Sequence, residues 1–324
     1  MAQVKILIEG EDVTQDLSPY LRGVSYEDVL SGKTDSLSLE LMDLDALFLG
    51  DWHIERGATV NATLIHNEEE FDLGSFEVDE LNYSYPPSVM KVKCNSCPQN
   101  SFLRQVDQSK SWENVKLSEI AKDIADAAQV ELFYETEEDP TIERAEQGEK
   151  SPLSFLESLC RKYYLIVKFS DGQIVIYDEQ KLDDKPPDFV LSRGGLLKRI
   201  SIKETLTDVY KSCQVNYNHE RKAETFAAQI DDPNKKTGKT LKINRKVSSQ
   251  AEAEKLAANE LREKNKDEFK LTLTSAGDFR LIAGNVFDLE GFGVYDGRWL
   301  LEKATHSIGK GYEVRAEARR CLHD

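Results

Sequence analysis

The spacing of apolar residues changes twice along this chain of 324 residues, and that change constrains the fold more than any other feature. In residues 1–97 apolar and polar residues alternate, as in the run SLSLEL from Ser36, which is typical of strands with one buried face. Between about residues 98 and 187 apolar residues recur every three or four positions, which predicts amphipathic helices. From residue 188 the alternation returns. The chain therefore predicts a mainly β protein with an α+β insert.

The first β region spans residues 1–97. Val4, Ile6 and Ile8 alternate with polar or smaller residues, and the polar break Asn67–Glu70 separates two later alternating runs. Short strands divided by polar turns predict a small barrel or sandwich. We expect a tube-like β-barrel domain here, with Pro98 closing its last strand.

The insert, residues 98–187, has signals for both helices and a hairpin. Ser151-Pro152 predicts the start of a helix, with Ser as N-cap and Pro at the first helical position. Asp171-Gly172 lies between two β-rich runs and predicts a tight hairpin turn. Residues 183–187 are predicted to form a linker out of the insert. Its expected core consists of Leu117, Ile120, Ile124, Leu156, Leu159, Ile166 and Ile174.

The second β region spans residues 188–324 and contains one long helix, predicted over residues 249–264. Ser249 and Glu252 have the spacing of a capping box at its start. Residues 222–238 are polar and predict a loop. The expected architecture is two tube-like β-barrel domains, a small α+β domain and one long helix in the second β region.

The charge and the apolar runs exclude several classes of protein. The net charge of -17 argues against a protein that grips nucleic acid, which requires clustered Lys and Arg, so we expect no stable nucleic-acid binding. No run of 18 apolar residues exists, so no membrane segment is expected. The acidic N-terminus does not resemble a secretory signal, and we expect synthesis in a cytoplasm.

Metal binding has only a weak signal. Cys94 and Cys97 have the spacing of half a zinc site, but no second Cys or His pair follows. An odd number of scattered cysteines does not predict a disulfide framework, so buried free thiols are expected. The five cysteines are Cys94, Cys97, Cys160, Cys213 and Cys321.

Motifs for catalysis and cofactor binding are absent, and we expect no enzyme, no catalytic residue and no cofactor. Gly238-Lys239-Thr240 resembles the end of a phosphate-binding loop but lacks its first glycine, and Gly291-Phe292-Gly293 fits a hairpin better than a dinucleotide site. The basic cluster 235–246 is either a patch for an acidic partner or, as we favour, a solvated loop. No metal-binding spacing links His53, His66, His219, His306 and His323.

Several stretches, in order along nearly the whole chain, resemble one known family. They are SFEVDE from Ser75, SWENVKLSEIAKDIA from Ser111, SPLSFLESLCRKYYLIVKFSDGQIVIYDE from Ser151, NRKVSSQAEAEKLAANELREKN from Asn244 and the run from Ala276 to Arg320. Together they resemble the late control D family of phage tail proteins, the baseplate hubs of contractile tails. Specificity lies in the ordered set, because no single stretch is a chemical signature.

The resemblance implies a structural homotrimer that joins the hexameric tail tube protein to the trimeric central spike protein in a virion baseplate or tail-like particle. It also implies a bacterial cytoplasm as the place of synthesis, and baseplate wedge or tape-measure proteins as further partners. Two similar β-domains in each of three chains would match a sixfold tube. The alternatives are a tail-associated cell-wall hydrolase and a tail-tip binding module.

Overall fold

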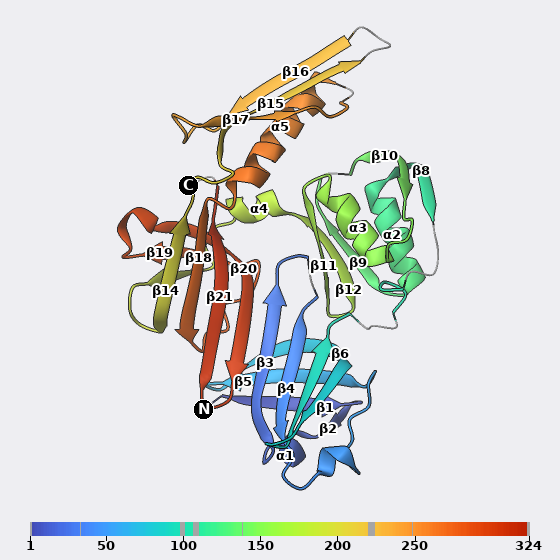
Figure 1. Cartoon of the computed structure of the whole chain (residues 1–324), viewed down its shortest axis with the longest axis vertical. Coiled ribbons are helices and arrows are strands. Elements are labelled where there is room, and N and C mark those ends of the chain that lie inside the picture. The colour runs from blue at the N-terminus through green and yellow to red at the C-terminus, as the bar shows by residue number, and fades with distance from the viewer. Residues whose placement is uncertain are drawn as a thin grey trace.

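The computed structural model describes residues 2–32, 34–97, 101–105, 110–137, 139–219, 224–247 and 249–322; the predictions on Pro98 and His323 lie outside these residues. The protein is mainly β, as predicted. Figure 1 shows a long sheet, a lobe of helices and short strands beside it, and an arm at one end. Among the described residues, no helix is long and apolar enough to cross a membrane.

The first β region is built from strands with alternating burial. Along one of them Leu37, Leu39 and Leu41 are buried while their neighbours are partly exposed, which explains the alternation in the sequence. The elements are β1 (Gln3–Ile8), β2 (Glu11–Asp12), α1 (Thr14–Leu17), β3 (Leu21–Val29), β4 (Ser36–Met42), η1 (Leu47–Leu49), β5 (Thr59–His66), β6 (Glu69–Ser84) and β7 (Val89–Asn95).

The insert forms two small sheets covered by helices. Ser151 caps the helix that begins at Pro152, and Asp171 and Gly172 both have positive φ in a two-residue hairpin turn; both predictions are confirmed. The elements are β8 (Ser111–Lys116), α2 (Leu117–Ala128), β9 (Glu131–Glu135), β10 (Thr141–Glu146), α3 (Pro152–Arg161), β11 (Leu165–Ser170), β12 (Gln173–Asp178) and α4 (Glu179–Asp184).

Two predictions for the insert are wrong. Ile166 does not belong to the insert's core: it packs against Leu30, Leu300 and Cys321 of the β regions, because the strands of a two-faced sheet bury alternate residues on opposite sides. The other six predicted core residues share one cluster. The predicted linker overlaps α4, whose acidic side chains are held by cations elsewhere in the fold, a tertiary effect that local sequence does not reveal.

The second β region carries an arm. The elements of the region are β13 (Phe189–Ser192), β14 (Leu197–Glu204), β18 (Phe269–Ala276), β19 (Val286–Glu290), η2 (Gly293–Tyr295), β20 (Gly297–Ile308) and β21 (Tyr312–Arg320). The arm consists of β15 (Tyr210–His219), β16 (Glu224–Asp231), β17 (Lys239–Ile243) and α5 (Gln250–Asn265). The Ser249 side chain accepts a hydrogen bond of 3.1 Å from the Glu252 N–H, as the capping signal predicts.

The loop predicted over residues 222–238 is wrong for residues 224–231, where β16 pairs with β15, and is confirmed for residues 232–238, which form turns between β16 and β17. Phe226, Ala228 and Ile230 alternate and pack against the cluster that includes α5. The described residues between and after them, Ala227, Gln229 and Asp231, are exposed and two of them are polar, so the alternation is weak in the sequence.

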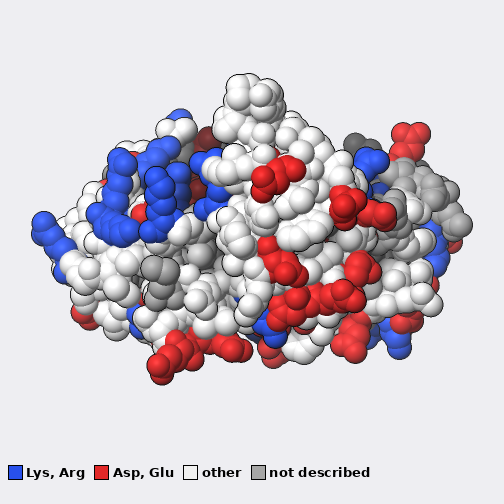
Figure 2. All heavy atoms as spheres, turned by 90° about the horizontal axis from the view of Figure 1, so that it is seen from below, with Lys and Arg blue, Asp and Glu red and all other residues white. Residues whose placement is uncertain are grey.

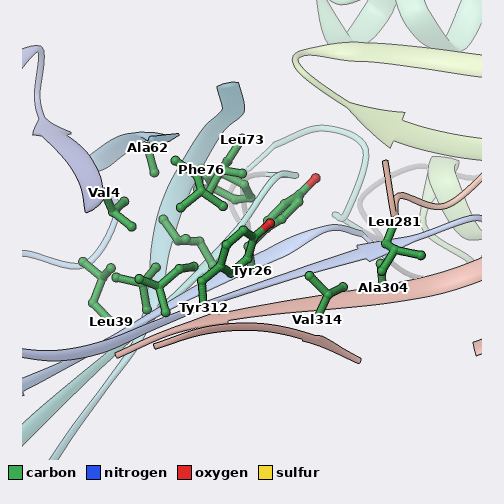
Figure 3. Close-up of a cluster of buried hydrophobic side chains, with 14 of the residues drawn as sticks. Val4, Tyr26, Leu39, Ala62, Leu73, Phe76, Leu281, Ala304, Tyr312 and Val314 are labelled. Atoms are coloured by element: carbon green, nitrogen blue, oxygen red, sulfur yellow. The ribbon is translucent and has the colours of Figure 1, made fainter. Parts of the chain in front are cut away.

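Both β regions contribute to a single 13-stranded sheet, which is continuous because β20 pairs with β3. The largest core cluster likewise draws on both regions, and Figure 3 shows Tyr26, Leu39 and Phe76 of the first region in the same cluster as Leu281, Tyr312 and Val314 of the second. The two regions therefore fold against each other.

Candidate assembly site

The two β regions repeat one strand order. In the first region neighbouring strands run β3-β4-β7-β6-β5-β1, and in the second they run β14-β18-β21-β20-β19-β13. Each of these six strands of the first region thus has a counterpart in the second, taken in the same chain order, whereas the short β2 has none. Every pair is antiparallel except β13 and β19, which are parallel.

Irregularities in the strand pairing repeat as well. The register shifts between Leu21 and Gly23 in β3, and between Leu197 and Arg199 in β14. It also shifts between Val78 and Glu80 in β6, and between Leu301 and Lys303 in β20. Since a β-bulge fixes the register around it, these shifts align the two regions residue by residue. Glu80 corresponds to Lys303, and Arg199 corresponds to Gly23.

Inside the chain, the two units meet at an antiparallel joint between residues 303–308 of β20 and 24–29 of β3. His306 lies opposite Tyr26 and Ile308 lies opposite Val24, and all four residues are buried. On the outer face, Lys303 Nζ and Glu27 Oε2 form an ion pair of 2.8 Å. The joint thus has a buried inner face, which includes Asp28 opposite Ala304, and a charged outer face.

The tip of the β20–β21 hairpin packs closely against β3. A Cβ atom on Gly309 would lie 3.0 Å from the Arg22 carbonyl oxygen, and one on Gly23 would lie 3.2 Å from the Ile308 carbonyl oxygen. Glycine at both positions allows the two backbones to approach this closely. The hairpin tip therefore packs against β3 at this end of the joint and excludes solvent from it.

Several described strands pair on one side only, among them β13 and β2, and two of these open edges correspond to the strands of the internal joint. β14 pairs with β18 on one side and with no strand on the other, although its counterpart β3 is paired on both sides. β6 has β7 along one side as far as Ser84, but its ladder with β5 ends at Glu77. An exposed strand edge is a template for pairing with another chain. Figure 1 shows β14 on the left of the sheet, far from β6.

The two open edges carry opposite charges. Exposed Lys198, Arg199 and Lys203 outnumber exposed Glu204 on β14, whereas Asp79 and Glu80 lie on the open part of β6. Figure 2 shows the same asymmetry at one end of the molecule, with Lys and Arg gathered on the side of the second region and Asp and Glu on the side of the first. Opposite charges favour contact between the two different edges over contact between like edges.

A shallow hollow adjoins the open edge of β14, with a volume of about 560 Å³. Its lining is both basic and apolar, and it is open to solvent. The lining residues are Arg193, Gly194, Leu197, Lys198, Arg199, Ile200, Gly291, Phe292 and Gly293.

A buried cluster of charges fastens α4 and α5 to the second region. Arg319 is fully buried and contacts Asp183 at 2.6 Å and Glu179 at 2.9 Å. Burial alone would raise the pKa of Glu179, but Arg319, Lys266 and Arg262 hold it below its usual value. Since a buried charge is costly without partners, this cluster holds the helices in fixed positions.

Among the described residues, the cysteines and histidines of the chain do not gather into a metal site. Cys94 and Cys97 are both buried, and burial raises the pKa of the Cys94 thiol to about 12, so it is a protonated packing residue at neutral pH. In the described ranges, no three His, Cys, Asp or Glu side chains are placed to hold a metal ion. The absence of metal, cofactor and catalysis in the protein itself stays a prediction.

The basic cluster 235–246 is partly a strand and not a loop, since β17 pairs in parallel with β15. Several of its charges are paired inside the chain: Lys235 with Glu268, and Arg245 with Glu260 at 2.8 Å. This pairing leaves less free charge for an acidic partner than the sequence suggests.

Sequence reasoning did not single out the open edges. The runs LKRISIKE in β14 and VDELNYS at the end of β6 alternate apolar with charged residues, and charged residues are frequent on edge strands. That signal was present, but only the paired structure shows which strands lie at an edge.

Comparison with known protein families assigns the chain to one of them. The model of the YQBQ-like family matches residues 24–314. The chain belongs to the YQBQ-like family. No curated protein matches the sequence. Membership of the late control D family, which the sequence resembles, stays a prediction.

Solved structures share the fold at low identity. A tail protein from Neisseria meningitidis MC58 is 13% identical, with a TM-score of 0.74, over 99% of this chain and 98% of that one. The 43 kDa tail protein of prophage MuSo2 from Shewanella oneidensis is 16% identical, with the same TM-score and coverage. The E. coli c3393 protein, a type VI secretion component, is 12% identical, with a TM-score of 0.58, over 92% of this chain and 73% of that one. The YQBQ-like chain therefore has the fold of these tail proteins.

Proposed function

We propose that this protein is the structural hub of a contractile-tail baseplate, a homotrimeric adaptor between a sixfold tail tube and a threefold central spike. The observation that carries the proposal is the repeated strand order with two complementary open edges. Two equivalent units in each chain give three copies a ring of six units. The same trimer keeps threefold symmetry for the spike.

The contact between copies in this ring is heterologous, because one edge of a chain meets a different edge of the next. The opposite charges of β14 and the open part of β6 fit such a contact. The solved tail proteins and the type VI secretion component that share the fold support placement in a tail or a related injection machine.

Residues 1–97, 98–187 and 188–324 are the proposed domains. The insert has a core of its own, while α4 near its end is bound to Arg319 of the second region. We assign the insert no partner. The tail tube protein and the central spike protein are the proposed direct partners of the ring, with wedge or tape-measure proteins around it.

Cryo-electron microscopy of the assembled particle tests this function. We expect this chain as three copies in a ring between the last sixfold disc of the tube and the spike. Its placement in a fibre tip or outside the tail axis would overturn the proposal. A peptidoglycan zymogram is a second test, in which clearing by the purified chain would identify a hydrolase instead.

A further inference from the structure

We propose that neighbouring copies join by pairing residues 80–85 of β6 and its hairpin in one copy with residues 200–205 at the open edge of β14 in the next. The partner is thus a second copy of this chain, held by the same kind of joint that β20 and β3 form inside it. This inference rests on the proposed ring, and its test separates failure of the joint from failure of the ring.

The repeated bulges set the register of the joint. Inside the chain Lys303 lies opposite Val29, and Ser307 lies opposite Ser25. Counting from the bulges, Ser84 corresponds to Ser307 and Ser201 corresponds to Ser25. The joint between copies therefore places Ser84 opposite Ser201.

The inner face of this register is apolar at two of its three pairs. It places Tyr83 opposite Ile202 and Tyr85 opposite Ile200. Tyr85 is 78% exposed in the single chain, and the other three side chains are partly exposed. Their counterparts in the internal joint are all buried, so pairing would remove the same face from water. At the third pair Leu81 lies opposite Glu204, as Ala304 lies opposite Asp28 in the internal joint.

The outer face preserves an ion pair with its signs exchanged. In the internal joint Lys303 contacts Glu27. Their counterparts are Glu80 and Lys203, so the acidic residue takes the place of the basic one. In the single chain Glu80 contacts Lys93 at 2.7 Å, and both are about half exposed. An exposed pair of this kind is weak and does not prevent a new contact.

The hairpin tip also has a receiving surface. In the internal joint, the tip at Gly309 lies against Arg22 and Gly23. The corresponding tip is exposed Tyr85-Pro86-Pro87, and the corresponding surface is Lys198 and Arg199, which line the hollow. Because Arg199 has a side chain where Gly23 has none, the two backbones must lie further apart there. The hollow supplies that room.

Cysteine cross-linking tests the register. Ser84 and Ser201 are exposed, and the five native cysteines are buried. Opposite residues in an antiparallel pair have Cα atoms about 4.5–5.5 Å apart, within the range of a disulfide. The variant with Ser84→Cys and Ser201→Cys should form a covalent trimer on oxidation, which dissociates on reduction.

Two controls define the result. Each single variant should give no cross-link, because the edges of one kind do not meet in a heterologous ring. Ser84→Cys with Lys203→Cys places the thiols on a diagonal, about 7–8 Å apart, and should cross-link far less. Equal cross-linking of the diagonal pair would overturn the register.

The mass of the wild-type protein in solution distinguishes failure of the proposed joint from failure of the proposed ring. A trimer by mass whose Ser84→Cys, Ser201→Cys form does not cross-link would overturn the joint and leave the proposed function standing. A wild-type monomer would overturn both.

The charge pair gives a second measurement that needs no oxidation. Glu80→Lys or Lys203→Glu alone should weaken assembly by about fivefold per joint, and the two together should restore it. Failure of the double variant to recover would also overturn the register.

Discussion

The two β regions have the same strand order but differ in how their edges are covered. The edge of β3 is closed inside the chain by β20, whereas the corresponding edge of β14 is open. The two regions also differ at the far end, where β1 is antiparallel to β5 and β13 is parallel to β19. The comparison shows that the same arrangement of strands forms an edge-to-edge joint within the chain and, as we propose, a second such joint between chains.

The largest expected difference between the regions is in the loss of unfolding free energy when Arg319 or its counterpart Asn95 is replaced. Arg319 is fully buried between Glu179 and Asp183, whereas the Asn95 amide donates a single hydrogen bond of 2.7 Å to Asp79. Arg319→Met should lower the free energy of unfolding by about 3–5 kcal/mol, because it leaves two buried carboxylates with fewer cations. Asn95→Leu should cost about 1–2 kcal/mol. Urea unfolding measures both, and equal losses would contradict the account.

A second prediction concerns the core between the regions. A Cβ atom on Gly277 would lie 1.8 Å from the Tyr312 ring, whose hydroxyl is 2.7 Å from His306 Nδ1. Gly277→Ala should therefore displace the ring and lower the free energy of unfolding by about 1–3 kcal/mol. Gly311→Ala is the matched control, since a Cβ atom there meets no atom within 4 Å. Thermal unfolding of both variants checks the difference, and equally stable variants would show that the ring moves freely.

A third prediction is a pH dependence where the insert joins the first region. Asp35 is buried, and burial raises its pKa to about 6, although Lys168 at 3.2 Å opposes the shift. Well below about pH 4 Asp35 is protonated in the folded and unfolded chains alike. As the pH rises to about 6 the unfolded chain loses this proton first, so folding stability falls.

The test compares the wild type with Asp35→Asn, which cannot ionise there. Relative to this variant, the wild type should lose roughly 1–2 kcal/mol of unfolding free energy between about pH 4 and pH 7. Denaturant titrations across that range measure the change. A constant difference between the two proteins would show that Asp35 ionises normally.

The smallest expected effect separates the internal joint from the joint between copies. Glu27 and Lys303 are each about one third exposed, so Glu27→Lys should lower chain stability by no more than about 1 kcal/mol. The double variant Glu27→Lys, Lys303→Glu should recover that loss. Unfolding of the dilute chain measures it, whereas Lys203→Glu should change assembly and leave chain unfolding nearly unaltered, because Lys203 lies exposed opposite Lys270. An effect of Lys203→Glu on unfolding as large as that of Glu27→Lys would remove the distinction.

The local parts of the fold were predictable from the sequence. Alternation predicted strands such as β1 and β4, Ser151 marked the start of a helix, and Asp171-Gly172 marked a turn, because each signal depends on neighbouring residues; β3 and β7 were not predicted. β16 was missed because its buried face is small and its exposed face is polar. The repeated strand order and the pairing of β20 with β3 depend on contacts across more than two hundred residues, which no local pattern encodes.

The mass of the purified chain in solution tests the central claim most directly. Two equivalent units in each chain, joined edge to edge, predict a closed trimer with three times the 36.8 kDa of one chain. Averaged electron micrographs of that species should show six similar densities around an open centre. The account would be contradicted by a chain that remains a 36.8 kDa monomer at high protein concentration, or by one that forms a twofold dimer.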